Sequence, residues 1–335
     1  MKLVTYRVKE RSLTIQGTFA ADARMGWLNG EYVVDAGFAQ EWAALEKGLP
    51  FRKVIPTDLL KLLDMGNEGM DLLRQIERAT RGTNPAALTV EGEPVALRRE
   101  EVKLLAPLPV PRSFRDFYAF EQHVKTSRAR RGLDMVPEWY EIPVFYFSNH
   151  HAFVGPDTDV IRPAYTTALD YELEIACVIG KPGIHIPAEK ALDHIAGFCV
   201  LNDWSARDVQ RKEMKVGLGP AKGKDFATSM GPCLVTLDEL EPYRKGDRWH
   251  LPMKASINGK LLSTGNAGDL YYSFGEMIAR ASESCRLLPG DVIGSGTVGT
   301  GCLLELGTEV HPWLQPGDVV ELEVEGLGVL RNRIA

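Results

Sequence analysis

Three acidic residues, Asp170, Glu172 and Glu174, stand two positions apart in the otherwise largely apolar segment LDYELEIACVIG. In a β-strand every second side chain projects from the same face, so this spacing predicts three carboxylates crowded together in an apolar setting. Such crowding is costly unless something neutralises the charge. Oxygen ligands suit Mg²⁺, Mn²⁺ or Ca²⁺ better than Zn²⁺, so the segment indicates a centre for a hard divalent cation.

A fourth acid supports the metal interpretation. Asp203 follows the apolar run 198–201 in the segment FCVLNDWSARDVQ, at the expected end of another strand. Strand ends often carry site residues. The alternative is an edge strand whose acidic face is simply solvated, and spacing alone leaves both interpretations open.

A histidine follows an acid further upstream. Ser113 can cap a helix over FRDFYAFEQHV, in which Asp116 and His123 are seven residues apart. Two helical turns would place both side chains on one side, about 10 Å apart along the axis. His123 could then be a base beside the metal, although a lone histidine is also often structural.

The basic run KTSRARRG follows this helix and contains Arg128, Arg130 and Arg131. A solvated helix face would explain it. The alternative is a mobile lid whose arginine closes on an anionic substrate.

Two glycine-rich stretches lie later in the chain. The run GSGTVGTG, residues 294–301, lacks the GK[ST] ending of a phosphate-binding P-loop, so we expect a tight loop that lines a pocket. Lys224, in GKDF, lies where the backbone could approach a ligand closely.

Several elements must position these residues. Alternating segments LVTYRV, LTIQGTF and RMGWLNGEYVVDA predict strands, with a hairpin turn at Asn29-Gly30, and helices are expected after Thr57 and over 68–80. The proline-rich LAPLPVPRS predicts a boundary between a small N-terminal α/β domain, 1–105, and a second domain, 106–335. The second domain reads mainly as strands, with helices after Pro187 and over 275–284 and a terminal hairpin in VVELEVEGLGVLRNRI. The predicted class is α+β, mainly β.

Composition excludes some functions. A net charge of −6 argues against nucleic acid as a partner, and no apolar run reaches the roughly 18 residues of a membrane span. The N-terminus resembles a first strand and not a secretory signal, so a cytoplasmic location is expected. The five cysteines show no CxxC pairing, which predicts reduced, buried thiols without zinc or disulfide roles.

Several strings, in order, resemble the fumarylacetoacetate hydrolase family: DFYAFEQH, LDYELEIACVIG, LNDWSARDVQ, GKDFATSMGP and GSGTVGTGCLLEL. The resemblance covers residues 110–330 and implies a mixed β-sandwich roll, a homodimer and a bound divalent cation, Mg²⁺ first, with Mn²⁺ or Ca²⁺ as alternatives. The metal ligands it implies are four carboxylates, those of Asp116, Glu172, Glu174 and Asp203.

The resemblance also implies further roles. His123 would be the catalytic base and Glu305 its partner, while Lys224 and Gln210 would stabilise an oxyanion. Asp170 is left outside the ligand set, as a supporting or surface residue. The positions that resemble substrate contacts are Tyr118, Tyr146, Arg131 in the lid, and Thr297.

The function implied is hydrolysis of a carbon–carbon bond in a β-diketone or acylpyruvate, fumarylacetoacetate-like, by water that His123 activates and an enolate that the metal stabilises. One alternative is a keto-enol isomerase, decarboxylase or hydratase acting on a 2-keto acid of aromatic catabolism. Another is a non-catalytic carbohydrate- or anion-binding module with a structural cation.

Overall fold

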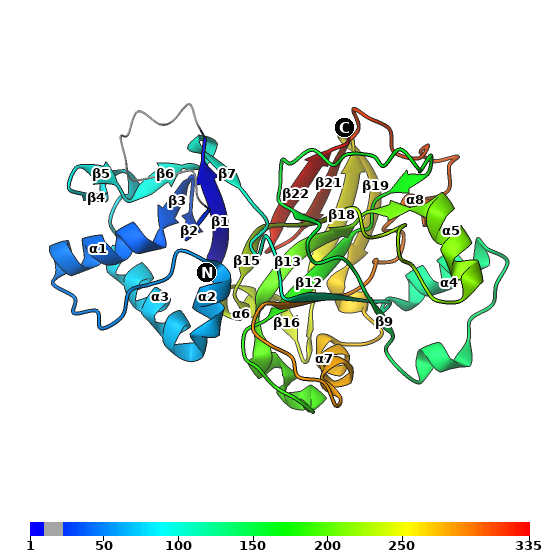
Figure 1. Cartoon of the computed structure of the whole chain (residues 1–335), viewed down its shortest axis with the longest axis horizontal. Coiled ribbons are helices and arrows are strands. Elements are labelled where there is room, and N and C mark those ends of the chain that lie inside the picture. Colours follow the sequence, from blue (N-terminus) through cyan, green and yellow to red (C-terminus); the bar gives the residue numbers. More distant parts are fainter. Residues whose placement is uncertain (10–22) are drawn as a thin grey trace.

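A computed structural model of the chain describes residues 1–9 and 23–335 (Figure 1). The expected strand LTIQGTF lies outside these residues. The architecture is α+β, with a large mixed sheet running through the molecule and a smaller sheet packed on part of it. The class expected from the sequence is confirmed.

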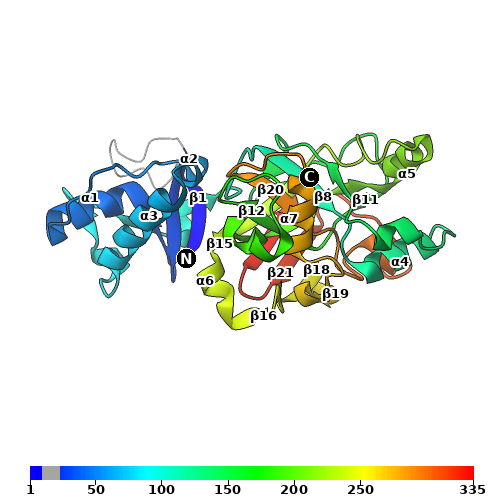
Figure 2. The ribbon, with the colours of Figure 1, turned by 90° about the horizontal axis from the view of Figure 1, so that it is seen from below.

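The N-terminal region lies at one end of the molecule in both views (Figures 1 and 2). Its helices pack beside antiparallel strands that belong to the large sheet. The strands of the large sheet here are β1 (Lys2–Val8), β2 (Arg24–Asn29), β3 (Tyr32–Asp35), β6 (Ala96–Arg98) and β7 (Val102–Leu104). Strands β4 (Thr89–Val90) and β5 (Glu93–Pro94) form a separate two-stranded sheet. The helices are α1 (Ala36–Lys47), α2 (Leu59–Asp64) and α3 (Gly66–Thr80).

Local signals in this region were partly correct. The hairpin forms, with Asn29 paired to Tyr32 and Gly30 in the left-handed conformation at φ 57°. Helix α2 is capped by Asp58, whose carboxylate accepts from the Lys61 amide at 2.9 Å, and not by Thr57. Helix α1 was not expected from the sequence.

The large sheet crosses the proposed domain boundary. Strand β1 pairs antiparallel with β15 (Thr228–Val235), with Leu3 opposite Leu234. The first strand of the chain is therefore hydrogen-bonded to a strand of the second region. The division at residue 105 stays a prediction.

The second region continues the same sheet. Its strands follow the order β15, β13, β12, β20, β8, β9, and the β20–β8 pair is parallel while the other pairs on this path are antiparallel. The strands are β8 (Ser113–Phe117), β9 (Phe145–Phe147), β12 (Glu174–Ile179), β13 (Ile195–Asp203) and β20 (Asp291–Gly294), and β10 (Phe153–Val154) pairs with β15.

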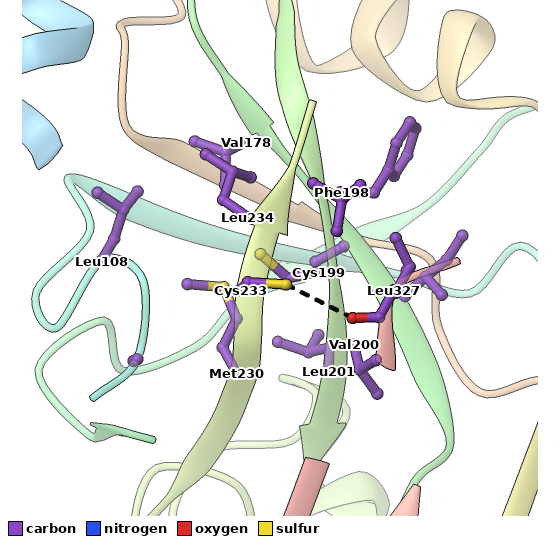
Figure 3. Close-up of a cluster of buried hydrophobic side chains, with 14 of the residues drawn as sticks. Leu108, Val178, Phe198, Cys199, Val200, Leu201, Met230, Cys233, Leu234 and Leu327 are labelled. Atoms are coloured by element: carbon purple, nitrogen blue, oxygen red, sulfur yellow. Dashed lines mark hydrogen bonds between the residues drawn. The ribbon is translucent and has the colours of Figure 1, made fainter. Parts of the chain in front are cut away.

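A four-stranded sheet packs against this part. Figure 3 shows buried apolar side chains of β12, β13 and β15 beside Leu327, which lies in the turn between two strands of the four-stranded sheet. Cys233 lies in this core, with its thiol 3.6 Å from the carbonyl oxygen of Leu327. The strands are β18 (Pro252–Ile257), β19 (Lys260–Asn266), β21 (Val319–Val324) and β22 (Gly328–Arg333). The expected terminal hairpin is β21–β22.

Shorter elements surround the sheets. The helices are α4 (Glu121–Ala129), α5 (Arg207–Val216), α6 (Leu237–Leu240), α7 (Phe274–Ser282) and α8 (Leu303–Leu306), and the two-residue strands are β11 (Leu169–Asp170), β14 (Ser205–Ala206), β16 (Arg244–Lys245) and β17 (Arg248–Trp249). The helix expected after Pro187 is a 3₁₀ helix, Ala188–His194.

The helix expected from Ser113 was wrong. Residues Ser113–Phe117 form β8, and α4 begins only at Glu121. Parallel pairing with β20, with Asp116 opposite Gly294, outweighs local helix propensity, and the Ser113 hydroxyl donates to Asp291 at 2.7 Å instead of capping a helix. Asp116 and His123 therefore project from different elements.

The sequence also predicted buried cysteine thiols and the absence of a membrane-spanning segment. All five cysteines are free, but Cys285 is exposed, so the prediction of buried thiols was wrong for that residue. The helices within residues 1–9 and 23–335 are all too short or too polar to span a bilayer.

The N-terminal region offers a stability test. The buried Asp35 carboxylate accepts from Tyr6 at 2.7 Å, from Arg24 at 2.6 and 2.9 Å, and from the Phe38 amide at 2.9 Å, where it caps α1. Asp35→Ala should lower the free energy of unfolding in urea by about 3–5 kcal/mol, because it removes these hydrogen bonds and the ion pair with Arg24 around a buried carboxylate. Asp58→Ala, which removes only an exposed cap, should cost about 1 kcal/mol. Equal losses in the two variants would contradict this account.

Candidate functional site

Carboxylates from separate strands converge in the second region. Asp116 lies on β8, Glu174 begins β12, Asp203 ends β13, and Glu172 lies between β11 and β12. Register brings them together, because Glu174 is opposite Leu201 on β13 and Asp116 is opposite Gly294 on β20, which also pairs with β12. All four side chains are buried. The alternative of a solvated acidic edge is therefore wrong.

Three of these acids form a compact group, which we call the carboxylate cluster together with Asp203. Oxygen atoms of Asp116, Glu172 and Glu174 lie within 4.8 Å of one another. Asp203 joins them through Lys224, whose ammonium donates to Asp203 at 2.8 Å and also to Glu172. The four acids predicted as ligands thus lie in one place.

Two buried cations balance part of the charge. Besides Lys224, Arg207 donates to Glu172 at 2.8 Å and to Asp170 at 2.7 Å. Burial works against ionisation of Glu172, but the charges of Lys224 and Arg207 lower the pKa of its carboxyl to about 2. Glu172 is therefore ionised at neutral pH.

Within residues 1–9 and 23–335, no further cationic side chain forms an ion pair with these acids. Counting Asp170, five buried carboxylates face two cationic side chains, so the five acids in their ionised forms would exceed the cations by three charges. Burial and the neighbouring acids raise the pKa values of the Asp116, Glu174 and Asp203 carboxyls. In addition, Glu174 Oε2 is buried without a hydrogen-bond partner. An all-oxygen donor set with surplus charge and an unsatisfied oxygen fits a hard divalent cation.

Asp170 lies next to the cluster and contacts it through Arg207. It is fully buried, so the surface alternative for this residue was wrong. Besides Arg207, it accepts from the amides of Leu303 at 2.8 Å and Leu304 at 3.0 Å, at the start of α8. One carboxylate thus holds both Arg207 and the helix that carries Glu305.

A histidine–carboxylate pair lies beside the cluster. His123, on α4, places Nδ1 2.5 Å from Glu305 Oε1, on α8, and both side chains are buried. The other Glu305 oxygen accepts from the Thr300 amide at 3.0 Å. The ring of Tyr118 meets the imidazole edge-on, with centroids 5.3 Å apart, and burial raises the pKa of Tyr118 to about 12. This arrangement orients the imidazole and presents its Nε2 as the free nitrogen.

The glycine-rich loop borders the cluster. A side chain at Gly294 would place Cβ 2.3 Å from Asp116 Oδ1, so only glycine leaves room for that carboxylate. Gly296, in the left-handed conformation at φ 75°, donates its amide to Asp116 at 3.2 Å. Thr297 donates its hydroxyl to Glu174 at 3.3 Å. The loop therefore fixes two carboxylates.

The other predicted positions differ in their surroundings. Tyr146 donates to Asp203, and Gln210 accepts from Arg207 at 3.0 Å, so both lie at the cluster. Arg131 is exposed after α4, where it donates to the carbonyl of Ser127 at 3.0 Å. Arg131 is thus not held at the cluster in this structure, and its contact with substrate stays a prediction.

Sequence reasoning missed two residues of the site. Arg207 stands four residues after Asp203 in LNDWSARDVQ, and a cation so near a predicted ligand was an available signal. Cys302 lies 3.7 Å from Glu305 Oε1, and no sequence pattern pointed to that contact.

The chain is similar in sequence to a known protein family and to several of its members. Residues 112–335 match the model of the fumarylacetoacetate (FAA) hydrolase C-terminal domain. The chain is 31% identical to fumarylacetoacetase from Arabidopsis thaliana, across 83% of this chain and 78% of the relative. It is also 31% identical to the human mitochondrial oxaloacetate tautomerase FAHD2A, across 85% and 82%.

A solved structure is similar in fold to this chain over its whole length. The fumarylacetoacetate hydrolase of psychrophilic Exiguobacterium antarcticum superimposes with a TM-score of 0.68 at 25% identity, covering 100% of this chain and 99% of that one. The relatives named here carry the names of enzymes of more than one reaction type, a hydrolase and a tautomerase. The family match spans well over half of the sequence and includes every residue of the carboxylate cluster. The chain therefore belongs to the fumarylacetoacetate hydrolase family.

Proposed function

We propose that the chain is a metal-dependent hydrolase that cleaves a carbon–carbon bond in a β-diketone or acylpyruvate. The observation that carries this proposal is the buried 2.5 Å contact between His123 Nδ1 and Glu305 beside a carboxylate cluster with surplus negative charge. A histidine oriented by a carboxylate is suited to activate water. A hydrolase needs this function, and a binding module does not.

Asp116, Glu172, Glu174 and Asp203 would hold the cation, Mg²⁺ first, with Mn²⁺ or Ca²⁺ as alternatives. When bound, the cation would supply Lewis acidity to the oxygen atoms of a chelating substrate. The two cationic side chains that contact Glu172 keep it ionised and ready for a metal. Asp170 orients one of them, Arg207, from the opposite side.

The proton transfers follow from the histidine pair. The Nδ1–H of His123 donates a hydrogen bond to the Glu305 carboxylate, which leaves the lone pair on Nε2 free. Nε2 takes a proton from water, and the resulting hydroxide attacks the distal carbonyl carbon of the substrate. The bond to the adjacent carbon breaks, that carbon leaves with the bonding electrons, and it is protonated by the imidazolium of His123, which restores the neutral base. The products are a carboxylic acid and a ketone.

Lys224 and Gln210 would stabilise the oxyanion formed in that attack. The Lys224 ammonium has three N–H groups, of which Glu172 and Asp203 engage two. Removing one oxyanion donor costs on the order of 3 kcal/mol of barrier. Tyr118, Tyr146, Thr297 and, after movement of the segment that follows α4, Arg131 are the proposed substrate contacts.

We also propose a cytoplasmic homodimer whose substrate is a small 2-keto or β-diketo acid. Free cysteines suit a reducing compartment. Exposed apolar side chains in the segment that follows α4 suit a contact between copies: Val136, Tyr140, Ile142, Val144 and Phe147.

A second candidate is a keto-enol tautomerase, or a related isomerase, decarboxylase or hydratase, acting on a 2-keto acid of the kind found in aromatic catabolism. It is supported by the equal identity, 31%, to a fumarylacetoacetase and to an oxaloacetate tautomerase. A base such as His123 could take a proton from carbon as readily as from water.

One screen separates the two candidates. The protein, loaded in turn with Mg²⁺, Mn²⁺ and Ca²⁺, is incubated with acylpyruvates, ring-cleavage 2-keto acids and oxaloacetate. The hydrolase proposal expects two fragments and uptake of one water oxygen from H₂¹⁸O into the acid product. Conversion of keto and enol forms without fragmentation would replace it with the tautomerase. Metal-dependent thermal stabilisation without any turnover would indicate a binding module.

His123→Ala should lower kcat by about 10²–10⁴-fold, because the proposed base is lost. Metal affinity, measured by calorimetry, should stay within a few-fold of the wild-type value, since His123 is not one of the proposed oxygen ligands. His194→Ala, at the end of the 3₁₀ helix that precedes β13, is the matched control. Turnover that survives in His123→Ala would sink the assignment.

Glu174→Gln should have opposite effects on the two forms of the protein. Without metal the variant should melt at a higher temperature than the wild type, because a buried carboxylate with a raised pKa has been neutralised. Metal affinity should fall more than about 100-fold, since even outer partners of a ligand contribute roughly 10–100-fold. The control is Glu189→Gln, at an exposed site. Unaltered stabilisation by Mn²⁺ in thermal melts would exclude Glu174 as a ligand.

A further inference from the structure

A second group of side chains of the types that ligate metals, His123, Cys302 and Glu305, lies next to the carboxylate cluster. His123 Nδ1, Cys302 Sγ and a Glu305 oxygen lie within 4.8 Å of one another, and all three residues are buried. We propose that this group is a separate site for Zn²⁺, and that zinc bound there stops turnover.

The donors match zinc and not the hard cations. One imidazole nitrogen, one thiol sulfur and one carboxylate oxygen are the ligands that Zn²⁺ prefers, whereas Mg²⁺ and Ca²⁺ prefer oxygen alone. The carboxylate cluster offers only oxygen. The two groups therefore differ in ligand type, and each should select a different class of metal ion.

The geometry requires little rearrangement. Tetrahedral zinc with bonds of about 2.0–2.3 Å places its ligand atoms roughly 3.3–3.8 Å apart. Cys302 Sγ is already 3.7 Å from Glu305 Oε1. His123 Nδ1 is 2.5 Å from the same oxygen, so this pair must open by about 1 Å as the metal replaces the shared proton. A water or substrate atom would complete four-coordination.

Charge favours occupancy as well. A neutral imidazole, a thiolate and a carboxylate together cancel the two charges of Zn²⁺, which suits a site where each residue is buried. The thiol proton is released to solvent as the sulfur–zinc bond forms. Cys302 precedes α8 and Glu305 lies within it, so the two come from one turn of chain while His123 comes from α4. This convergence over distant segments is why cysteine spacing alone predicted no zinc role.

Zinc bound at this site would prevent His123 from acting as the proposed base. Zinc on Nδ1 forces the proton of the neutral ring onto Nε2, the nitrogen that must accept a proton from water. It also takes Glu305 away from the imidazole. The loss of turnover rests on the function proposed above, whereas the binding itself does not.

Binding of Co²⁺ at this site can be measured by absorption spectroscopy, without an assay of enzymatic turnover. Protein saturated with Mg²⁺ is titrated with Co²⁺, and one equivalent should bind with a thiolate-to-cobalt absorption band in the near ultraviolet. Zn²⁺ should abolish this band and inhibit with the same stoichiometry. Cys302→Ser should lose the band and weaken zinc binding more than about tenfold, because one ligand is lost. Cys285→Ser, at the exposed cysteine, is the matched control and should keep both.

Three results would overturn the proposed binding site. They are a wild-type protein without the band, a band that persists in Cys302→Ser, and inhibition by Zn²⁺ that excess Mg²⁺ reverses, which would place zinc in the carboxylate cluster. If Cys302→Ser does not fold, His123→Gln serves as the second variant and must also weaken zinc binding. If turnover cannot be detected at all, the cobalt titration still decides the binding site. A normal band with undiminished turnover would overturn the inhibition.

Discussion

Surplus negative charge in a buried place is the constraint on which the rest of the second region depends. Five carboxylates lie around two cationic side chains, and burial, together with the neighbouring acids, raises the pKa values of Asp116, Glu174 and Asp203. Strands hold these acids where they cannot move apart, because each lies on or next to a paired strand of the large sheet. The folded chain therefore keeps an unfavourable arrangement ready for a cation, and the free energy of metal binding can offset the repulsion.

The network around this charge also connects the two halves of the site. Asp170 accepts from Arg207, which in turn donates to Glu172, and the same carboxylate holds the amides that begin α8. Glu305, on α8, orients His123. A disturbance of Asp170 would thus reach both the proposed metal ligands and the proposed base. The residue that the sequence left as a supporting or surface position is central to the geometry.

Sequence reasoning singled out residues that the structure places together where a local pattern carried the signal. Glu172, Glu174 and Asp203 stand out because acids in apolar runs are costly, and the hairpins at Gly30 and at the C-terminus follow from turn residues. It failed where distant pairing decided the outcome. Asp116 lies on a strand because β20, far along the chain, pairs with it, and no local propensity reveals such a partner. The contacts of Arg207 with Asp170 and of Cys302 with Glu305 likewise depend on packing that becomes visible only in three dimensions.

The pairing of β1 with β15 bears on how this protein can be dissected. A shortened version that begins near residue 106 would retain the whole carboxylate cluster but would lose the strand that lies against Leu234 and Val235. The backbone groups of β15 that β1 engages would then be open to pairing with a strand from another molecule, and such open strands promote self-association. Truncation near residue 106 would therefore lower the solubility of the protein while leaving the residues of the carboxylate cluster in place. In the intact chain, β1 occupies this edge of β15.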